Sequence, residues 1–109
     1  MIDKTLLSIV LGQPYTSITD VRLRDEEIIY NTSSLPNTNY KSINLDTLQK
    51  KCKIWAHENG VILSSHISNS GRGVCSMYCD EDEMVFNDET ELEAVLEATK
   101  YAAEIKGLI

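Results

Sequence analysis

The chain has 109 residues, of which 42% are hydrophobic and 25% are charged, and its formal charge is −7. This length and composition predict a single globular domain and exclude the fibrous and disordered classes. No apolar stretch is long enough to span a membrane and no signal-peptide pattern is present, so we expect a cytoplasmic protein without a membrane partner.

The N-terminal third is predicted to contain one short helix and one β-hairpin. Residues 3–11 combine a good N-cap residue, Asp3, with an apolar face. Residues 16–23 predict a half-buried strand, because Thr19, Val21 and Leu23 alternate with the charged residues Asp20, Arg22 and Arg24. Residues 28–30 follow a polar turn and predict the returning strand of the hairpin.

Residues 31–44 predict a polar loop, because nine of these fourteen residues are Asn, Ser or Thr. Loops of this length inside a compact domain are uncommon and are usually functional or mobile. The segment is therefore a candidate contact region.

The strongest helical pattern lies at residues 44–59. Asn44 is a good N-cap, and the apolar side chains of Leu48, Cys52 and Trp55 recur on one helical face. This spacing predicts an amphipathic helix whose tryptophan belongs to the core.

A three-stranded antiparallel meander is predicted next, over residues 61–68, 74–79 and 83–86. The glycine-containing segment at residues 69–73 supplies the first turn, and an acidic segment supplies the second.

Residues 88–106 predict the terminal helix, with Asp88 and Glu91 at the spacing of a capping box. The element order is then α-β-β-α-β-β-β-α. This order predicts an α+β fold in which an antiparallel sheet, made of the hairpin plus the three-stranded meander, carries its helices on one face. We expect residues 1–109 to form one domain.

The charge is concentrated at the C-terminal end. Residues 1–79 hold eight Lys or Arg and seven Asp or Glu, whereas residues 80–109 hold two and ten, so the two parts carry +1 and −8. Such a potential steers a basic protein surface and opposes direct binding to nucleic-acid phosphates. The alternative is a solvated acidic surface with no docking role. The candidate partner-binding residues are Asp80, Glu81, Asp82, Glu83, Asp88, Glu89, Glu93 and Glu97.

A second candidate site is the turn between the first two strands of the meander. Backbone amides of Ser70, Gly71 and Arg72 could cradle a phosphate, and His66 is expected close by. No nucleotide-binding motif surrounds the turn, and a simple hairpin explains its glycines equally well.

The three cysteines are interpreted as reduced core residues. Cys75 and Cys79 lie on the same face of a predicted strand and lack the paired spacing of zinc sites, and Cys52 lies on the apolar face of its helix. No nucleophile–base pair is recognisable. We therefore predict no metal ion, no cofactor and no enzymatic activity.

Two groups of residues carry a family resemblance. The first runs from Ile43-Asn44-Leu45 to Cys52-Lys53-Ile54-Trp55-Ala56, and the second runs from Asn87-Asp88-Glu89-Thr90-Glu91 to Glu93-Ala94-Val95. Over residues 43–101 the chain resembles small phage and prophage accessory proteins. The resemblance implies a protein that binds a host protein, including host defence proteins, and it assigns no residue a role.

The leading interpretation is a non-enzymatic acidic protein that binds and inhibits or modulates a basic host protein, such as a nucleic-acid-binding or defence protein. One alternative is an immunity protein that neutralises a toxic nuclease. Another is a protein that binds or sequesters a nucleotide at the glycine turn or at residues 31–44. Pairing of two copies through an exposed sheet face bearing Ile62 and Tyr78 is compatible with each of them.

Overall fold

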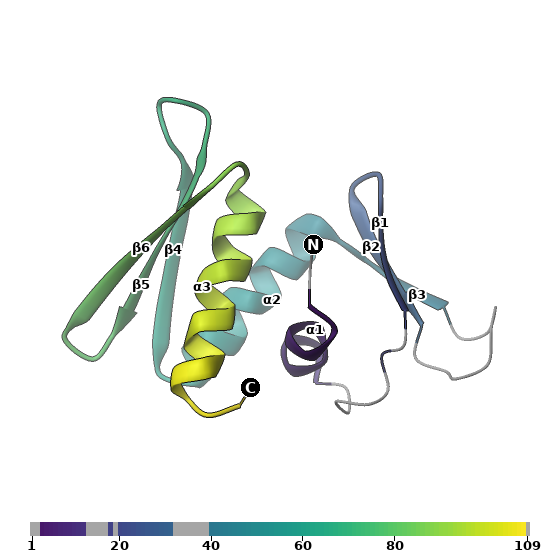
Figure 1. Cartoon of the computed structure of the whole chain (residues 1–109), viewed down its shortest axis with the longest axis horizontal. Helices are drawn as coiled ribbons and strands as arrows, with labels where there is room; N and C mark the ends of the chain where they lie inside the picture. The colour runs from purple at the N-terminus through teal and green to yellow at the C-terminus, as the bar shows by residue number, and fades with distance from the viewer. Residues whose placement is uncertain (1–2, 13–17, 19, 32–39, 109) are drawn as a thin grey trace. The chain divides into compact units, whose positions relative to one another are not determined.

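The computed structural model describes residues 3–12, 18, 20–31 and 40–108 (Figure 1). The chain divides into two compact units, Met1–Leu48 and Gln49–Ile109. The described residues form three helices and two antiparallel three-stranded sheets in the order α-β-β-β-α-β-β-β-α. The α+β class is confirmed, and the predicted order lacks one strand. The prediction of a single sheet is wrong, because the hairpin and the meander belong to two separate sheets.

Helix α1 (Lys4–Leu11) begins as the sequence predicts. Asp3 is its N-cap, and the Asp3 carboxylate accepts a hydrogen bond of 2.7 Å from the backbone N–H of Thr5. Gly12 ends the helix with a φ of 69°, a left-handed conformation that glycine adopts without strain. Leu6 and Leu7 are buried.

The first sheet consists of β1 (Asp20–Arg24), β2 (Glu27–Asn31) and β3 (Tyr40–Asn44), in that order and with antiparallel pairing. The predicted loop over residues 31–44 is therefore wrong at both ends, because Asn31 closes β2 and Tyr40–Asn44 pairs with β2. The middle of that loop, residues 32–39, lies outside the described residues, as do residues 16, 17 and 19 of the predicted first strand.

Helix α2 (Leu45–Glu58) follows β3 without a connecting loop. The side-chain oxygen of Asn44 accepts a hydrogen bond of 2.8 Å from the backbone N–H of Asp46, so the predicted N-cap is confirmed. Cys52 and Trp55 are buried, as their helical spacing predicts.

The second sheet is the predicted meander of β4 (Val61–Ile67), β5 (Gly73–Cys79) and β6 (Asp82–Asp88). Its inner face carries buried Cys75, Met77 and Phe86. Residues of the opposite parity are more exposed, and Ile62 and Tyr78 pair directly there with exposed fractions of 57% and 40%.

Helix α3 (Glu91–Ile105) contacts β4, β5 and β6 and covers the inner face of this sheet (Figure 1). Four buried alanines keep the helix close to the strands, and the rings of Phe86 and Tyr101 lie 5.8 Å apart. Thr90 is the N-cap, and its hydroxyl accepts a hydrogen bond of 3.1 Å from the N–H of Glu93. The predicted start at Asp88 is wrong, because Asp88 still pairs with Gly73 as the last residue of β6.

Candidate functional site

The eight predicted partner-binding residues fall into two groups at opposite ends of β6. Asp82 and Asp88 are six residues apart along this strand, which is about 20 Å at the rise of an extended chain. We call the residues at the start of β6 the turn group and the residues at its end the junction group. The turn group is Asp80, Glu81, Asp82 and Glu83, and the junction group is Asp88, Glu89, Glu93 and Glu97.

The junction group is built around a contact between two carboxyl groups. Asp88 and Glu97 share a side-chain hydrogen bond, which together with burial and the Asp88 charge raises the pKa of Glu97. The Oδ2 atom of Asp88 is buried and has no hydrogen-bond partner among the described residues. Glu93 lies one helical turn before Glu97 on α3 and is exposed. Negative charge is therefore concentrated where β6 meets α3.

All four residues of the turn group are exposed, and one of them has a defined partner. Glu83 is opposite Tyr78 in the β5–β6 register. The hydrogen bond from the Tyr78 hydroxyl to Glu83 raises the pKa of Tyr78. No Lys or Arg occurs in the sequence between Arg72 and Lys100, so β5, β6 and the first turns of α3 supply no cation to either acidic group.

Glu91 also belongs to the acidic residues 80–109, but its carboxylate makes hydrogen bonds within the fold. Its Oε2 accepts a hydrogen bond of 2.6 Å from the Ser65 hydroxyl and one of 2.9 Å from the Gln49 side-chain amide. These bonds link α3 to β4 and α2 within the second unit. A carboxylate that already accepts two hydrogen bonds is poorly placed to meet a partner.

The turn at residues 68–72 uses its polar groups internally. The N–H of Gly71 donates to the carbonyl of Ser68, and the N–H of Arg72 donates to the Ser68 hydroxyl at 3.2 Å. The hydroxyl of Ser70 is 2.9 Å from that of Ser68. Two of the amides expected to cradle a phosphate are thus already engaged. His66 is exposed and pairs with Val74 on the outer face of β4 and β5.

The cysteines are free thiols, and two of them lie in the core. Cys52 and Cys75 are fully buried, and burial raises the pKa of each thiol to about 11. Neither is therefore a thiolate at neutral pH, which is the form that attacks a substrate or binds a metal. Among the residues that the structure describes, no three His, Cys, Asp or Glu side chains are grouped in a way that would hold a metal ion.

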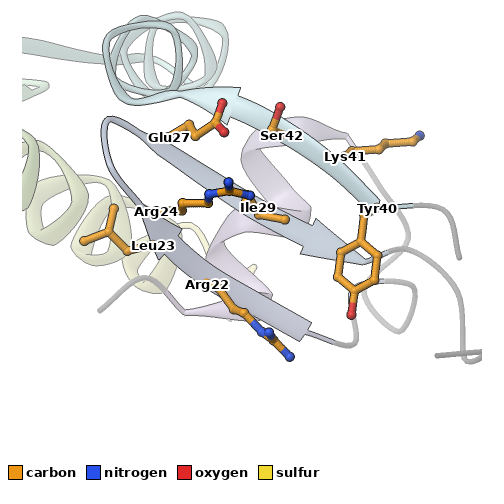
Figure 2. A pocket seen from close by; sticks show the side chains of 8 residues that line it. All are labelled: Arg22, Leu23, Arg24, Glu27, Ile29, Tyr40, Lys41 and Ser42. Atoms are coloured by element: carbon orange, nitrogen blue, oxygen red, sulfur yellow. The ribbon is translucent and has the colours of Figure 1, made fainter. Parts of the chain in front are cut away.

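An open depression on the first sheet was not anticipated from the sequence. It encloses about 630 Å³ over β1, β2 and β3 (Figure 2). Its lining combines three basic side chains, one carboxylate and several apolar or hydroxyl-bearing side chains. The lining residues are Arg22, Leu23, Arg24, Glu27, Ile29, Tyr40, Lys41 and Ser42.

This depression is basic in a chain that carries −7, with three cations against one carboxylate. The only sequence signal for it is the placement of Arg22 and Arg24 two residues apart, hence on one face of a strand. The part of the lining that comes from β3 could not be predicted, because the polar composition of residues 40–44 indicates a loop and not a strand.

None of the helices in the described residues is both long and apolar enough to cross a membrane. Comparisons with protein-family models, with curated proteins and with solved structures give no match to this chain.

Proposed function

We propose that this protein is a non-enzymatic interaction protein that binds and inhibits or modulates a basic host protein through its acidic carboxyl-terminal third. The proposal includes action in the cytoplasm of a bacterial host, since the chain resembles phage accessory proteins over residues 43–101. The observation that carries it is the junction group, which gathers carboxylates at the meeting point of β6 and α3.

The energetics of the junction group support a docking role. Two carboxyl groups in contact repel each other when both are ionised, and this repulsion contributes to the raised pKa of Glu97. A lysine or arginine of a partner that docks beside the exposed Glu97 would relieve the repulsion. Binding of a cation is therefore more favourable here than at an isolated surface carboxylate.

The turn group is assigned a different part in the same process. Its four carboxylates are exposed at the other end of β6, about 20 Å from Asp88. This distance exceeds the Debye length of about 8 Å at physiological salt, so the two groups act nearly independently. We assign long-range steering to both groups and close contact to the junction group alone.

The two buried thiols are poorly suited to nucleophilic catalysis. Nucleophilic catalysis needs a thiolate or an activated hydroxyl beside a base. Cys52 and Cys75 are buried away from solvent with thiol pKa values of about 11. Electrostatic docking requires no such group.

Affinity capture with paired charge reversals tests the proposal. The immobilised protein is exposed to a lysate of a bacterial host, and captured proteins are quantified by mass spectrometry. We expect a basic protein to be retained by the wild type and lost when Glu93→Lys and Glu97→Lys are combined. Combining Asp82→Lys and Glu83→Lys is expected to weaken capture without abolishing it.

A matched control separates the acidic groups from total charge. Glu58→Lys with Glu104→Lys makes the same change in net charge at exposed positions near the C-terminal ends of α2 and α3, where the helix dipole favours cations. This control is expected to retain the partner. Equal loss of capture in the control and in the junction variant would show that net charge alone is responsible.

A further inference from the structure

We propose that the open face of the β1–β2–β3 sheet is a binding site for a small phosphorylated ligand of the nucleotide class. The site lies wholly in the first unit, whereas the turn group and the junction group belong to the second unit. Its ligand has the opposite charge from the protein partner proposed above.

The strand register brings the polar side chains of this face together in rows. Arg22 of β1 is opposite Ile29 of β2, which is opposite Ser42 of β3. In the next row, Arg24 is opposite Glu27. Because cross-strand partners point to the same face of a sheet, all five side chains share the open face.

Two arginines leave the same face of β1. The backbone positions of Arg22 and Arg24 are about 7 Å apart along β1. Figure 2 shows the guanidinium of Arg24 over Ile29 in the middle of the sheet, with Arg22 and Lys41 pointing outward at the rim. A guanidinium matches two phosphate oxygens at once, so Arg24 is placed for the central contact, and Arg22 reaches a neighbouring phosphate by a change of rotamer.

The apolar part of the depression suits a flat ring. Tyr40 is 42% exposed at the edge of the sheet, and Ile29 forms the floor between the outer strands. An aromatic base can stack on a tyrosine ring or a guanidinium plane, while Ser42 and Glu27 can hydrogen-bond to hydroxyl or amino groups. A simple inorganic anion would leave these groups unused.

The dimensions favour a small ligand over a nucleic-acid strand. Each strand has five residues, a length of about 17 Å, and about 630 Å³ lies within the roughly 300–1,000 Å³ range of small-molecule sites. A polyanion would also be repelled by a chain of formal charge −7. A single nucleotide carries only a few negative charges, so it is repelled less than a polyanion.

Titration of the full-length protein with ADP, followed by amide chemical shifts in nuclear magnetic resonance spectra, tests the inference. We expect saturable shifts in the amides of β1, β2 and β3 with a Kd below about 1 mM. Pyrophosphate is expected to shift the same amides with weaker affinity, because it engages the arginines only, and adenosine is expected to bind most weakly.

Variants assign the shifts to the site. Arg22→Gln combined with Arg24→Gln should weaken ADP binding by about tenfold or more, since charge-assisted hydrogen bonds are lost. Tyr40→Leu should remove the advantage of ADP over pyrophosphate. Lys50→Gln with Lys51→Gln removes the same charge from exposed positions of α2 and should leave binding unchanged.

Three results would overturn the inference. The first is the absence of saturable shifts in β1, β2 and β3 with ADP. The second is unchanged ADP binding in the double-arginine variant. The third is equal binding of a hexaglutamate peptide, which would identify the depression as an unselective anion surface.

Discussion

Asp88 and Glu97 join the end of β6 to the second turn of α3 through their carboxyl groups, and this contact raises the pKa of Glu97. Two acids in contact have a cost when both are ionised, so the fold does not gain stability from this arrangement at neutral pH. Residues that weaken a fold while creating a local potential are typical of binding surfaces. The pair therefore links the stability of the second unit to its proposed function.

Glu97→Gln is expected to stabilise the protein at pH 7, because it removes the repulsion from Asp88. The gain is at most about 1 kcal/mol, since Glu97 is exposed and solvent screens this repulsion. A carboxyl group whose pKa is raised on folding binds its proton more tightly in the folded state. The free energy of unfolding therefore falls as pH rises from the ordinary pKa through the raised pKa. The gain should vanish below the ordinary pKa of 4.5, where Glu97 is protonated in both states.

Urea unfolding of the wild type and the variant at pH 7 and pH 4 measures this difference. Glu93→Gln removes a charge one turn earlier on α3 and serves as the control, with no gain expected. A pH-independent gain, or an equal gain from the control, would contradict a specific interaction with Asp88.

Gly73→Ala is expected to destabilise the protein by about 3 kcal/mol or more, because the new methyl group cannot be accommodated. A Cβ at this position would overlap the carbonyl oxygen of Thr90, which belongs to the backbone and cannot rotate away. The absence of a side chain at Gly73 thus lets the start of β5 approach the N-cap of α3.

Gly71→Ala is the comparison for this steric effect. Gly71 has a φ of 84°, but a methyl group added there would have no neighbour within 4 Å among the described residues. Alanine at this position should therefore cost only about 1 kcal/mol through backbone strain. Denaturant unfolding of both variants gives the two values. Similar losses would show that the backbone near Thr90 moves readily.

Thr90→Ala is expected to cost about 1 kcal/mol, since the N–H of Glu93 loses its hydrogen-bond acceptor at the start of α3. Thr90→Ser keeps the hydroxyl and should retain most of the stability. Asp88→Asn should cost nothing at pH 7, because Asp88 does not cap the helix and its repulsion with Glu97 is relieved. A larger loss from Asp88→Asn than from Thr90→Ala in thermal unfolding would restore the capping box that the sequence suggested.

Cys52 and Cys75 are expected to resist alkylation by iodoacetamide at about pH 7.5 in the native protein. Their thiol pKa values of about 11 leave only a very small thiolate fraction, and both side chains are fully buried. Cys79 is only partly buried and should react first. Peptide mapping by mass spectrometry, with and without denaturant, identifies the modified thiols, and rapid native labelling of Cys52 would contradict the burial of this face of α2.

Helix α2 and the second sheet could largely be predicted from the sequence. The spacing of Leu48, Cys52 and Trp55 identified α2, and Asn44 identified its start, because a helical period and a cap are local signals. The meander was predicted from alternation and turns in the same way. The start of α3 was not, since capping by Asp88 or Thr90 depends on whether Asp88 is still paired in β6.

The first sheet was less predictable because β3 has little local signal. Of its five residues only Ile43 is buried, and the strand exists through pairing of its backbone with β2. The basic depression requires this pairing, since Tyr40 and Ser42 join Arg22 and Arg24 only after the register is set. Likewise, the acidic residues 80–97 are close together in the sequence. Because β6 is an extended strand between them, they lie in two separate groups in the structure.

The junction group is proposed to bind a basic partner, and the salt dependence of association tests this role most directly. Stopped-flow measurement with the captured protein should show the wild-type association rate constant falling by about tenfold or more between about 0.05 and 0.5 M salt. The variant combining Glu93→Lys and Glu97→Lys should associate slowly at every salt concentration. Identical rate constants and identical salt dependence in the wild type and this variant would contradict the account.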